Sequence, residues 1–181
     1  MTSSSSRFDV IAQLPAMRRY ALTLTRDPAD AEDLVQDALV RAYAKRASYD
    51  DERELRPWLL AILHAVFIDG VRSRRAELLR IARAGETSDD HHAPAQDHVV
   101  RLAQIREQFA SLPEEQRAAL HLVAVEGLSY ADAANVLGAP VGTLMSRLAR
   151  AREALRRIEA AEPEKRPQHL RIVRGTDGID A

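Results

Sequence analysis

The sequence has no cysteine among its 181 residues, and aromatic residues make up only 4% of it. The missing thiols exclude disulfides and thiolate metal sites and suit a reducing cytoplasm, which is the expected location. The chain does not start like a signal peptide, and no apolar run approaches the ~20 residues that cross a bilayer, so we expect no membrane insertion. There is neither a glycine-rich phosphate loop nor a plausible catalytic triad. An enzyme with a small-molecule substrate or a cofactor is therefore not expected.

The hydrophobic residues, 46% of the chain, recur at three- and four-residue steps, which is the spacing of amphipathic helices. Asp27 and Pro28 suit the N-cap and first position of one helix, and Pro57 suits the start of another. Leu112-Pro113 marks a further break. We expect helices over residues 8–25, 28–46, 57–84, 113–125, 129–137 and 141–159, a helical stretch that begins near Val99, and no strand-rich segment.

Residues 85–98 are rich in Gly, Pro, Ser, Asp and His and show no hydrophobic period, which predicts a flexible linker. The fold class is therefore all-α, with two small helical domains, 8–84 and 99–160, followed by a tail over 161–181. Imidazole and carboxylate groups in the linker could bind zinc or nickel, but in such a polar stretch solvated side chains are the expected state, so no metal site is predicted. The linker residues concerned are Asp89, Asp90, His91, His92 and His98.

The second domain contains the pattern of a helix-turn-helix: a short helix, a turn with glycine and a longer helix. On the longer helix we expect a buried stripe of Val141, Leu144, Met145, Leu148 and Leu155. A different face carries hydroxyls and guanidiniums, which reach phosphates and purine edges in a major groove; it consists of Thr143, Ser146, Arg147 and Arg150, flanked by Arg152, Arg156 and Arg157. The competing interpretation is a salt-bridged surface helix, but only Glu153 lies among these arginines to pair with them.

The first domain separates its charges. The helix over 57–84 has an apolar first half and a basic end, which could contact nucleic acid or simply suit the helix dipole. Trp58, at its start, is expected in the core. The helix over 28–46 is acidic, and Asp33, Gln36 and Asp37 form an exposed face suited to a basic protein partner. His64 and His121 lie in apolar stretches and are expected to be buried or half-buried.

Three segments of the chain resemble regions 2 and 4 of extracytoplasmic-function (ECF) sigma factors. They are DPADAEDLVQDALVRAY, LRPWLLAILHAVFIDGVRSRR and LPEEQRAALHLVAVEGLSYADAANVLGAPVGTLMSRLARAREAL, and the resemblance covers about residues 10–160. It implies a protein that binds core RNA polymerase through the β′ and β subunits and directs it to promoter DNA.

The resemblance also implies roles for individual residues. The residues expected to bind polymerase are Asp33, Gln36 and Asp37. Those expected to read the −35 element are Thr143, Ser146, Arg147, Arg150 and Arg152. The residues expected to read and melt the −10 element are the loop around 49–56 together with Trp58, Asp69, Arg72, Arg74 and Arg75. A base flipped into a pocket and a backbone held by basic residues is the physical logic of that step.

The sequence departs from the family pattern at a few positions. Ala65 stands where members often have Asn, and Asp132 and Ala133 replace a more usual Glu-Ile. Two other functions fit part of the pattern: an ordinary helix-turn-helix regulator, and a sigma-like mimic that binds an anti-sigma factor. Neither needs the acidic helix and both basic helices together. An anti-sigma factor is also an expected partner of a sigma factor with exposed docking faces.

Overall fold

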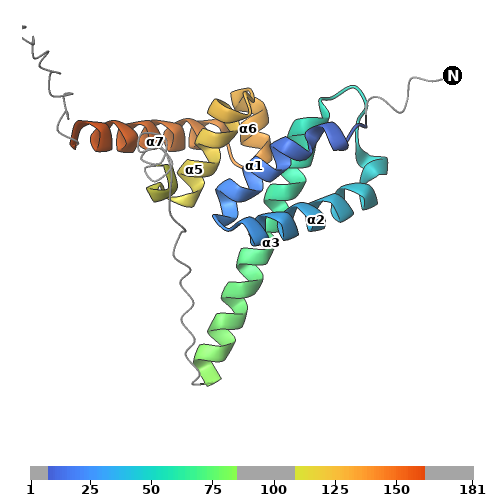
Figure 1. Cartoon of the computed structure of the whole chain (residues 1–181), viewed down its shortest axis with the longest axis horizontal. Helices are drawn as coiled ribbons and strands as arrows, with labels where there is room; N and C mark the ends of the chain where they lie inside the picture. The colour runs from blue at the N-terminus through green and yellow to red at the C-terminus, as the bar shows by residue number, and fades with distance from the viewer. Residues whose placement is uncertain (1–7, 85–108, 162–181) are drawn as a thin grey trace, which may run out of the picture.

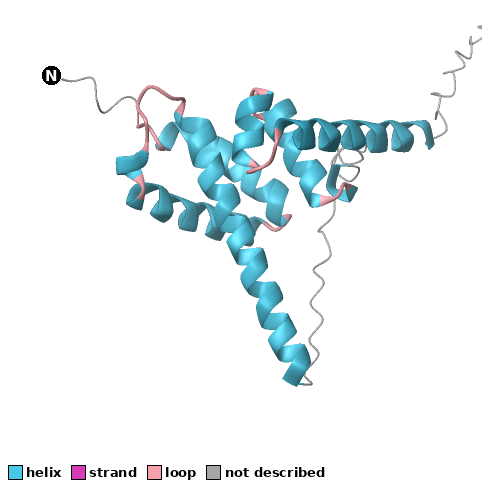
Figure 2. Cartoon of the chain, turned by 180° about the vertical axis from the view of Figure 1, so that it is seen from behind, coloured by secondary structure: helices cyan, strands magenta, loops and turns pink. Residues whose placement is uncertain are grey.

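The computed structural model describes residues 8–84 and 109–161, and all of its regular structure there is helical. The first domain comprises η1 (Ile11–Gln13), α1 (Leu14–Thr25), α2 (Pro28–Ala44), η2 (Arg46–Ser48) and α3 (Leu55–Ala84). The second comprises α5 (Glu114–Leu120), a π-helical turn η3 (His121–Val125), α6 (Tyr130–Val136) and α7 (Val141–Ala161). Figure 2 shows only helices and loops in the described part of the chain, which confirms the all-α fold class.

The short connection between α1 and α2 is determined by local chemistry. Arg26 ends α1 in the left-handed conformation, with φ of 63°. Asp27 then caps α2, its carboxylate accepting from the amides of Ala29 at 2.8 Å and Asp30 at 3.0 Å. Pro28 is the first helical residue, as predicted. A cap of this kind contributes about 1 kcal/mol, and the turn lets α1 and α2 pack side by side.

Helix α3 begins two residues before the predicted start, at Leu55 rather than Pro57. Pro57 is tolerated because the first amides of a helix have no intrahelical partner. The first half of α3 is buried against α1 and α2 through Leu59, Leu60 and Leu63, each fully inaccessible. The second half projects from the body of the molecule (Figure 1). Its side chains from 72 to 80 are exposed, so this half is free to contact other molecules.

The helix-turn-helix is present as predicted, but the buried stripe of α7 differs. Ser129 caps α6, and Gly138, with φ of 58°, makes the turn. Leu144 and Leu148 are buried together with Ala151. The predictions for Val141 and Met145 were wrong, since these side chains are 43% and 53% exposed. Met145 lies 100° around the helix from Leu144, and the small Ala151 completes the stripe instead.

The two domains contact each other directly. Helix α1 lies against α5 and η3, and α3 lies against α6 (Figure 1). The sequence pattern predicts two domains on a tether but gives no indication of this contact. The linker and the tail, with the five candidate metal ligands at 89–98, lie outside the described residues. Along the described segments, no helix combines the length and hydropathy needed to cross a membrane.

Candidate nucleic-acid interface

The structure divides the predicted reading face of α7 into two parts. Ser146 and Arg150 are exposed, one turn apart, beside the exposed Met145 and Ala149. The Ser146 hydroxyl donates to the carbonyl oxygen of Thr143 at 2.9 Å, which leaves its oxygen able to accept. This surface combines a guanidinium and a hydroxyl with apolar groups, and apolar groups contact the thymine methyl in a major groove. Sequence reasoning missed Met145 because a methionine at helical spacing fits a core equally well.

Arg147 and Thr143 lie on a less accessible side of α7. Arg147 forms an ion pair with Glu115 of α5, with 2.8 Å between Nη2 and Oε2. Its side chain is only 19% exposed, whereas that of Glu115 is 69% exposed. Thr143 is half-buried. The four residues predicted to share one face therefore differ in access: two are exposed, and two are turned toward the protein.

The C-terminal part of α7 carries further exposed arginines. Arg152 is exposed. Arg156 and Arg157 lie 3.6 Å and 3.3 Å from the carboxylate of Glu153, which is the pairing that the sequence suggested. Exposed pairs of this kind contribute at most about 1 kcal/mol, so these guanidiniums can readily exchange Glu153 for a phosphate.

An aromatic cluster lies in the first domain, around Trp58 near the start of α3. Trp58 is half-buried against the core, as predicted, with its ring centroid 5.1 Å from that of Tyr49 and 6.0 Å from that of Phe8. Tyr43, 57% exposed, approaches Phe8 edge-on, and the guanidinium of Arg46 lies 4.8 Å above the Phe8 ring. Phe8 and Tyr43 were not singled out from the sequence, because rings from segments far apart in the chain meet only in the folded domain. Aromatic faces with a neighbouring guanidinium are suited to stacking on bases.

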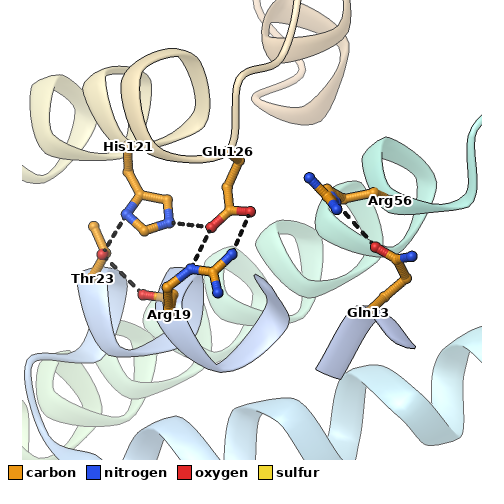
Figure 3. A network of polar contacts seen from close by, with 6 residues as sticks. All are labelled: Gln13, Arg19, Thr23, Arg56, His121 and Glu126. Carbon is orange, nitrogen blue, oxygen red and sulfur yellow. Dashed lines mark hydrogen bonds and ion pairs between the residues drawn. The ribbon is translucent and has the colours of Figure 1, made fainter. Parts of the chain in front are cut away.

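A surface pocket of about 860 Å³ adjoins this cluster. It is lined by Gln13, Tyr49 and the loop and helix start at 51–56. On its wall, Arg56 donates through Nε to the side-chain oxygen of Gln13 at 3.0 Å (Figure 3). The Tyr49 hydroxyl donates to the carbonyl oxygen of Arg53 at 2.6 Å, which holds the loop in a turn. The pocket thus combines carboxylates, guanidiniums and amide groups beside an aromatic surface.

The basic end of α3 carries Arg72, Arg74 and Arg75, all exposed on the projecting half of the helix. Asp69 lies just before them and accepts from Arg41 of α2 at 2.7 Å. That hydrogen bond is the main cause that holds the pKa of Asp69 below its ordinary value, and the charges of Arg41, Arg72 and Lys45 act in the same direction. Asp69 therefore remains ionised and joins α3 to α2, while the arginines beyond it face solvent.

The acidic face of α2 is exposed as predicted. Asp33, Gln36 and Asp37 point outward, opposite the buried Leu34, Val35 and Ala38. Val40, 71% exposed, lies one turn further along the same face, and sequence reasoning missed it. Val40 adds an apolar group to this acidic face. A surface of this mixed character is suited to a protein partner with basic and apolar groups.

Both expected buried histidines lie where the domains meet. His64 Nδ1 is 3.0 Å from the hydroxyl of the fully buried Tyr20. Burial, and secondarily the charge of Arg147, lowers the pKa of His64 to about 4. Burial also lowers the pKa of His121, against the opposing effect of Glu126. Burial raises the pKa of Tyr20. Within 8–84 and 109–161, no group of three or more histidine and acidic side chains is placed to hold a metal ion.

Two family models match the chain. The model described as Sigma-70 region 2 matches residues 10–77, and that described as Sigma-70, region 4 matches residues 102–155. The ECF RNA polymerase sigma factor EcfG of Rhodopseudomonas palustris (strain TIE-1) is 35% identical over 185 residues, which is 97% of this chain and 98% of that one. The ECF RNA polymerase sigma factor SigC of Mycobacterium tuberculosis (strain CDC 1551 / Oshkosh) is 40% identical over 141 residues, 76% of this chain and 74% of that one.

Solved structures agree with these matches. The sigma factor RpoE of Bartonella quintana, in complex with the anti-sigma factor NepR, is 32% identical with a TM-score of 0.70, and the match covers 89% of this chain and 100% of that one. CnrH, in complex with the cytosolic domain of CnrY, is 26% identical with a TM-score of 0.61, over 90% of this chain and 92% of that one.

Proposed function

The chain belongs to the ECF sigma factors of the sigma-70 family, and from this membership we propose how its surfaces share the work of promoter recognition. As a sigma factor it directs promoter recognition and the initiation of transcription. Residues 8–84 act as the region 2 domain and residues 99–160 as the region 4 domain. One observation carries the assignment of surfaces: an acidic face, a pocket beside an aromatic cluster and two basic helices are exposed at separate places on one small chain.

The −35 element binds to α7. Ser146 and Arg150 read base edges, and Arg152 holds a phosphate, because these side chains are exposed on one helix of a helix-turn-helix. Met145 adds an apolar contact to a thymine methyl. Thr143 and Arg147 also contact the −35 element after Arg147 has left Glu115 and bound DNA instead. Arginine is suited to such an exchange, since its planar guanidinium can pair bidentately with carboxylate, phosphate or guanine.

The −10 element binds to the first domain. The pocket lined by Tyr49 and residues 51–56 receives an unstacked base, and Trp58 with its aromatic neighbours supports the pocket. Arg72, Arg74 and Arg75 hold the backbone of the strand, and Asp69 positions that helix through Arg41. Ala65 is exposed on α3 and offers no amide to a base, so recognition depends more heavily on the loop.

Core RNA polymerase binds the acidic face of α2 through Asp33, Gln36 and Asp37, with Val40 as an apolar contact. Carboxylates on this face attract a basic surface of the polymerase and repel DNA. An anti-sigma factor is a further partner, which is supported by the complexes of RpoE with NepR and of CnrH with CnrY. Such an inhibitor acts by covering the faces that polymerase needs.

In vitro transcription with purified core polymerase on a promoter library tests this function. The protein is expected to bind the core enzyme and to start transcription at a subset of promoters that share −35 and −10 sequences. A helix-turn-helix repressor would bind DNA alone and would not support initiation. A sigma-like mimic would bind an anti-sigma factor but neither core enzyme nor promoter. Either of these results would contradict the proposal.

A further inference from the structure

The contact between the two domains contains a group of polar side chains, which we call the latch: Arg19 and Thr23 of α1, and Arg117, His121 and Glu126 of the second domain. Figure 3 shows all of them except Arg117. Arg19 binds Glu126 through two hydrogen bonds, each 3.0 Å long. The Glu126 side chain is completely buried, whereas that of Arg19 is half exposed. A buried carboxylate needs a cation nearby, and Glu126 receives it from the other domain.

The other latch residues add directed hydrogen bonds. His121 Nε2 lies 3.2 Å from Glu126, and Nδ1 lies 2.9 Å from the Thr23 hydroxyl. Because a carboxylate only accepts hydrogen bonds and the pKa of His121 is lowered, the neutral ring donates from Nε2 to Glu126. The single hydroxyl hydrogen of Thr23 is then shared between two acceptors, His121 Nδ1 and the carbonyl oxygen of Arg19 at 3.0 Å. The guanidinium of Arg117 donates to the carbonyl oxygen of Thr23 at 2.7 Å. That carbonyl is in the last turn of α1, where helix carbonyls lack intrahelical partners and cations are favoured.

The closed arrangement also affects the −35 reading helix. Arg147 is 19% exposed and lies beside Glu115. Helix α3 of the first domain lies against α6, which in turn packs on α7, so the first domain lies beside the reading helix. A helix that enters a major groove has a phosphate backbone on either side. With the first domain beside α7, duplex DNA has less room on that side of the helix.

We propose that the latch closes region 4 onto α1 of region 2 in the free protein, and that opening it is required for full −35 binding. This inference rests on the proposed function. The apparent affinity for DNA is then reduced by the fraction of molecules that are closed. Exchanging Arg19 for a carboxylate opens the chain, because Glu126 would face a like charge and would gain water only by leaving α1.

Arg19→Glu and a matched control, Arg18→Glu, test the proposal in the full chain. Arg18 neighbours Arg19 but pairs with Glu32 of the same domain, at 2.8 Å, so its loss leaves the latch intact. The chain has no cysteine, and dyes can be placed uniquely at Ala47→Cys in η2 and Asn135→Cys in α6, both exposed. Energy transfer reports domain separation, −35 duplex anisotropy reports binding, and far-UV circular dichroism verifies the fold.

The expected result is lower energy transfer and a several-fold gain in −35 affinity for Arg19→Glu, with Arg18→Glu and the unsubstituted protein alike and with helicity unchanged. Equal energy transfer in all three proteins would overturn the latch, and so would lower transfer in an Arg19→Glu protein that binds the −35 duplex no more tightly than the unsubstituted protein does. If energy transfer falls but no variant binds promoter DNA or supports transcription with core polymerase, the closure by Arg19 is supported and the proposed function is contradicted instead.

Discussion

The arginine-rich segments of α3 and α7 present the same side chains in different surroundings. Arg72, Arg74 and Arg75 are all exposed on a helix half that projects from the body (Figure 1). On α7, Arg150 is equally accessible, but Arg147 is drawn against Glu115 of α5. Identical side chains on comparable helices thus differ in what they can bind. The neighbouring helix determines the difference, because an arginine already paired must exchange its partner before it contacts DNA.

The largest effect is expected from Arg150→Ala, which removes an exposed guanidinium from the reading face. A bidentate contact to guanine contributes about 1–3 kcal/mol, which corresponds to roughly 5- to 150-fold in affinity. Arg147→Ala should weaken binding to the −35 duplex by less, about three-fold, because its ion pair with Glu115 offsets part of the contact. Fluorescence anisotropy on a −35 duplex measures both. Arg18→Ala, which removes an exposed arginine of the first domain, is the control. A larger loss from Arg147→Ala than from Arg150→Ala would reverse our assignment of the faces.

Acidification should loosen the junction between the two regions. His64 has a pKa of about 4 in the native state and an ordinary value near 6.5 when unfolded. Between these values the unfolded chain binds a proton that the native chain does not, so stability is complete above about pH 6.5 and falls as the pH drops toward 4. Going from pH 8 to pH 5 should cost about 2 kcal/mol from this group.

Urea unfolding of the unsubstituted protein and of His64→Gln, at about pH 8 and about pH 5, measures the contribution of His64 to this loss of stability. The substituted protein should lose less stability on acidification, because glutamine accepts the Tyr20 hydrogen bond without titrating. Carboxylates titrate equally in both proteins, so the difference between them isolates His64. Identical losses in the two proteins would show that His64 does not sense pH.

Asp37→Arg sharpens the comparison between the acidic and the basic surfaces. The substitution places a cation on the exposed face of α2, and core-polymerase affinity should fall about ten-fold, which corresponds to roughly 1.4 kcal/mol of lost attraction and new repulsion. Glu52→Arg, exposed but away from α2, provides a matched charge change. Polymerase binding by both variants at equal strength would remove α2 from the interface, whereas −35 duplex binding should remain unchanged in either case.

Arg72→Ala is expected to have the smallest effect. Loss of one exposed phosphate contact should slow formation of the open complex about two- to five-fold, because each such contact contributes only part of a shared electrostatic term. Permanganate reactivity of unpaired thymines measures opening. Duplex binding at the −35 element should stay constant, and a parallel loss of −35 binding would show that α3 and α7 do not act on separate elements.

Much of the local structure could be predicted from the sequence. Asp27 and Pro28 start α2 as expected, Leu112-Pro113 precedes α5, and the glycine turn leads into α7. These features depend on residues a few positions apart, where backbone geometry and capping leave few choices. The helix-turn-helix and the family resemblance follow from the same local patterns. Periodicity could not tell that Met145 would be exposed, because the width of a buried stripe depends on what packs against it.

The sequence by itself determined an all-helical chain with an acidic helix, two basic helices and the identity of a sigma factor. Only the tertiary structure decided which arginines are accessible, that four aromatic side chains cluster and one of them, Tyr49, lines a pocket, and that Arg19 and Glu126 meet. The last two residues are 107 positions apart. A contact at that separation depends on how whole helices dock, and docking is governed by buried surfaces and charges that no local pattern records.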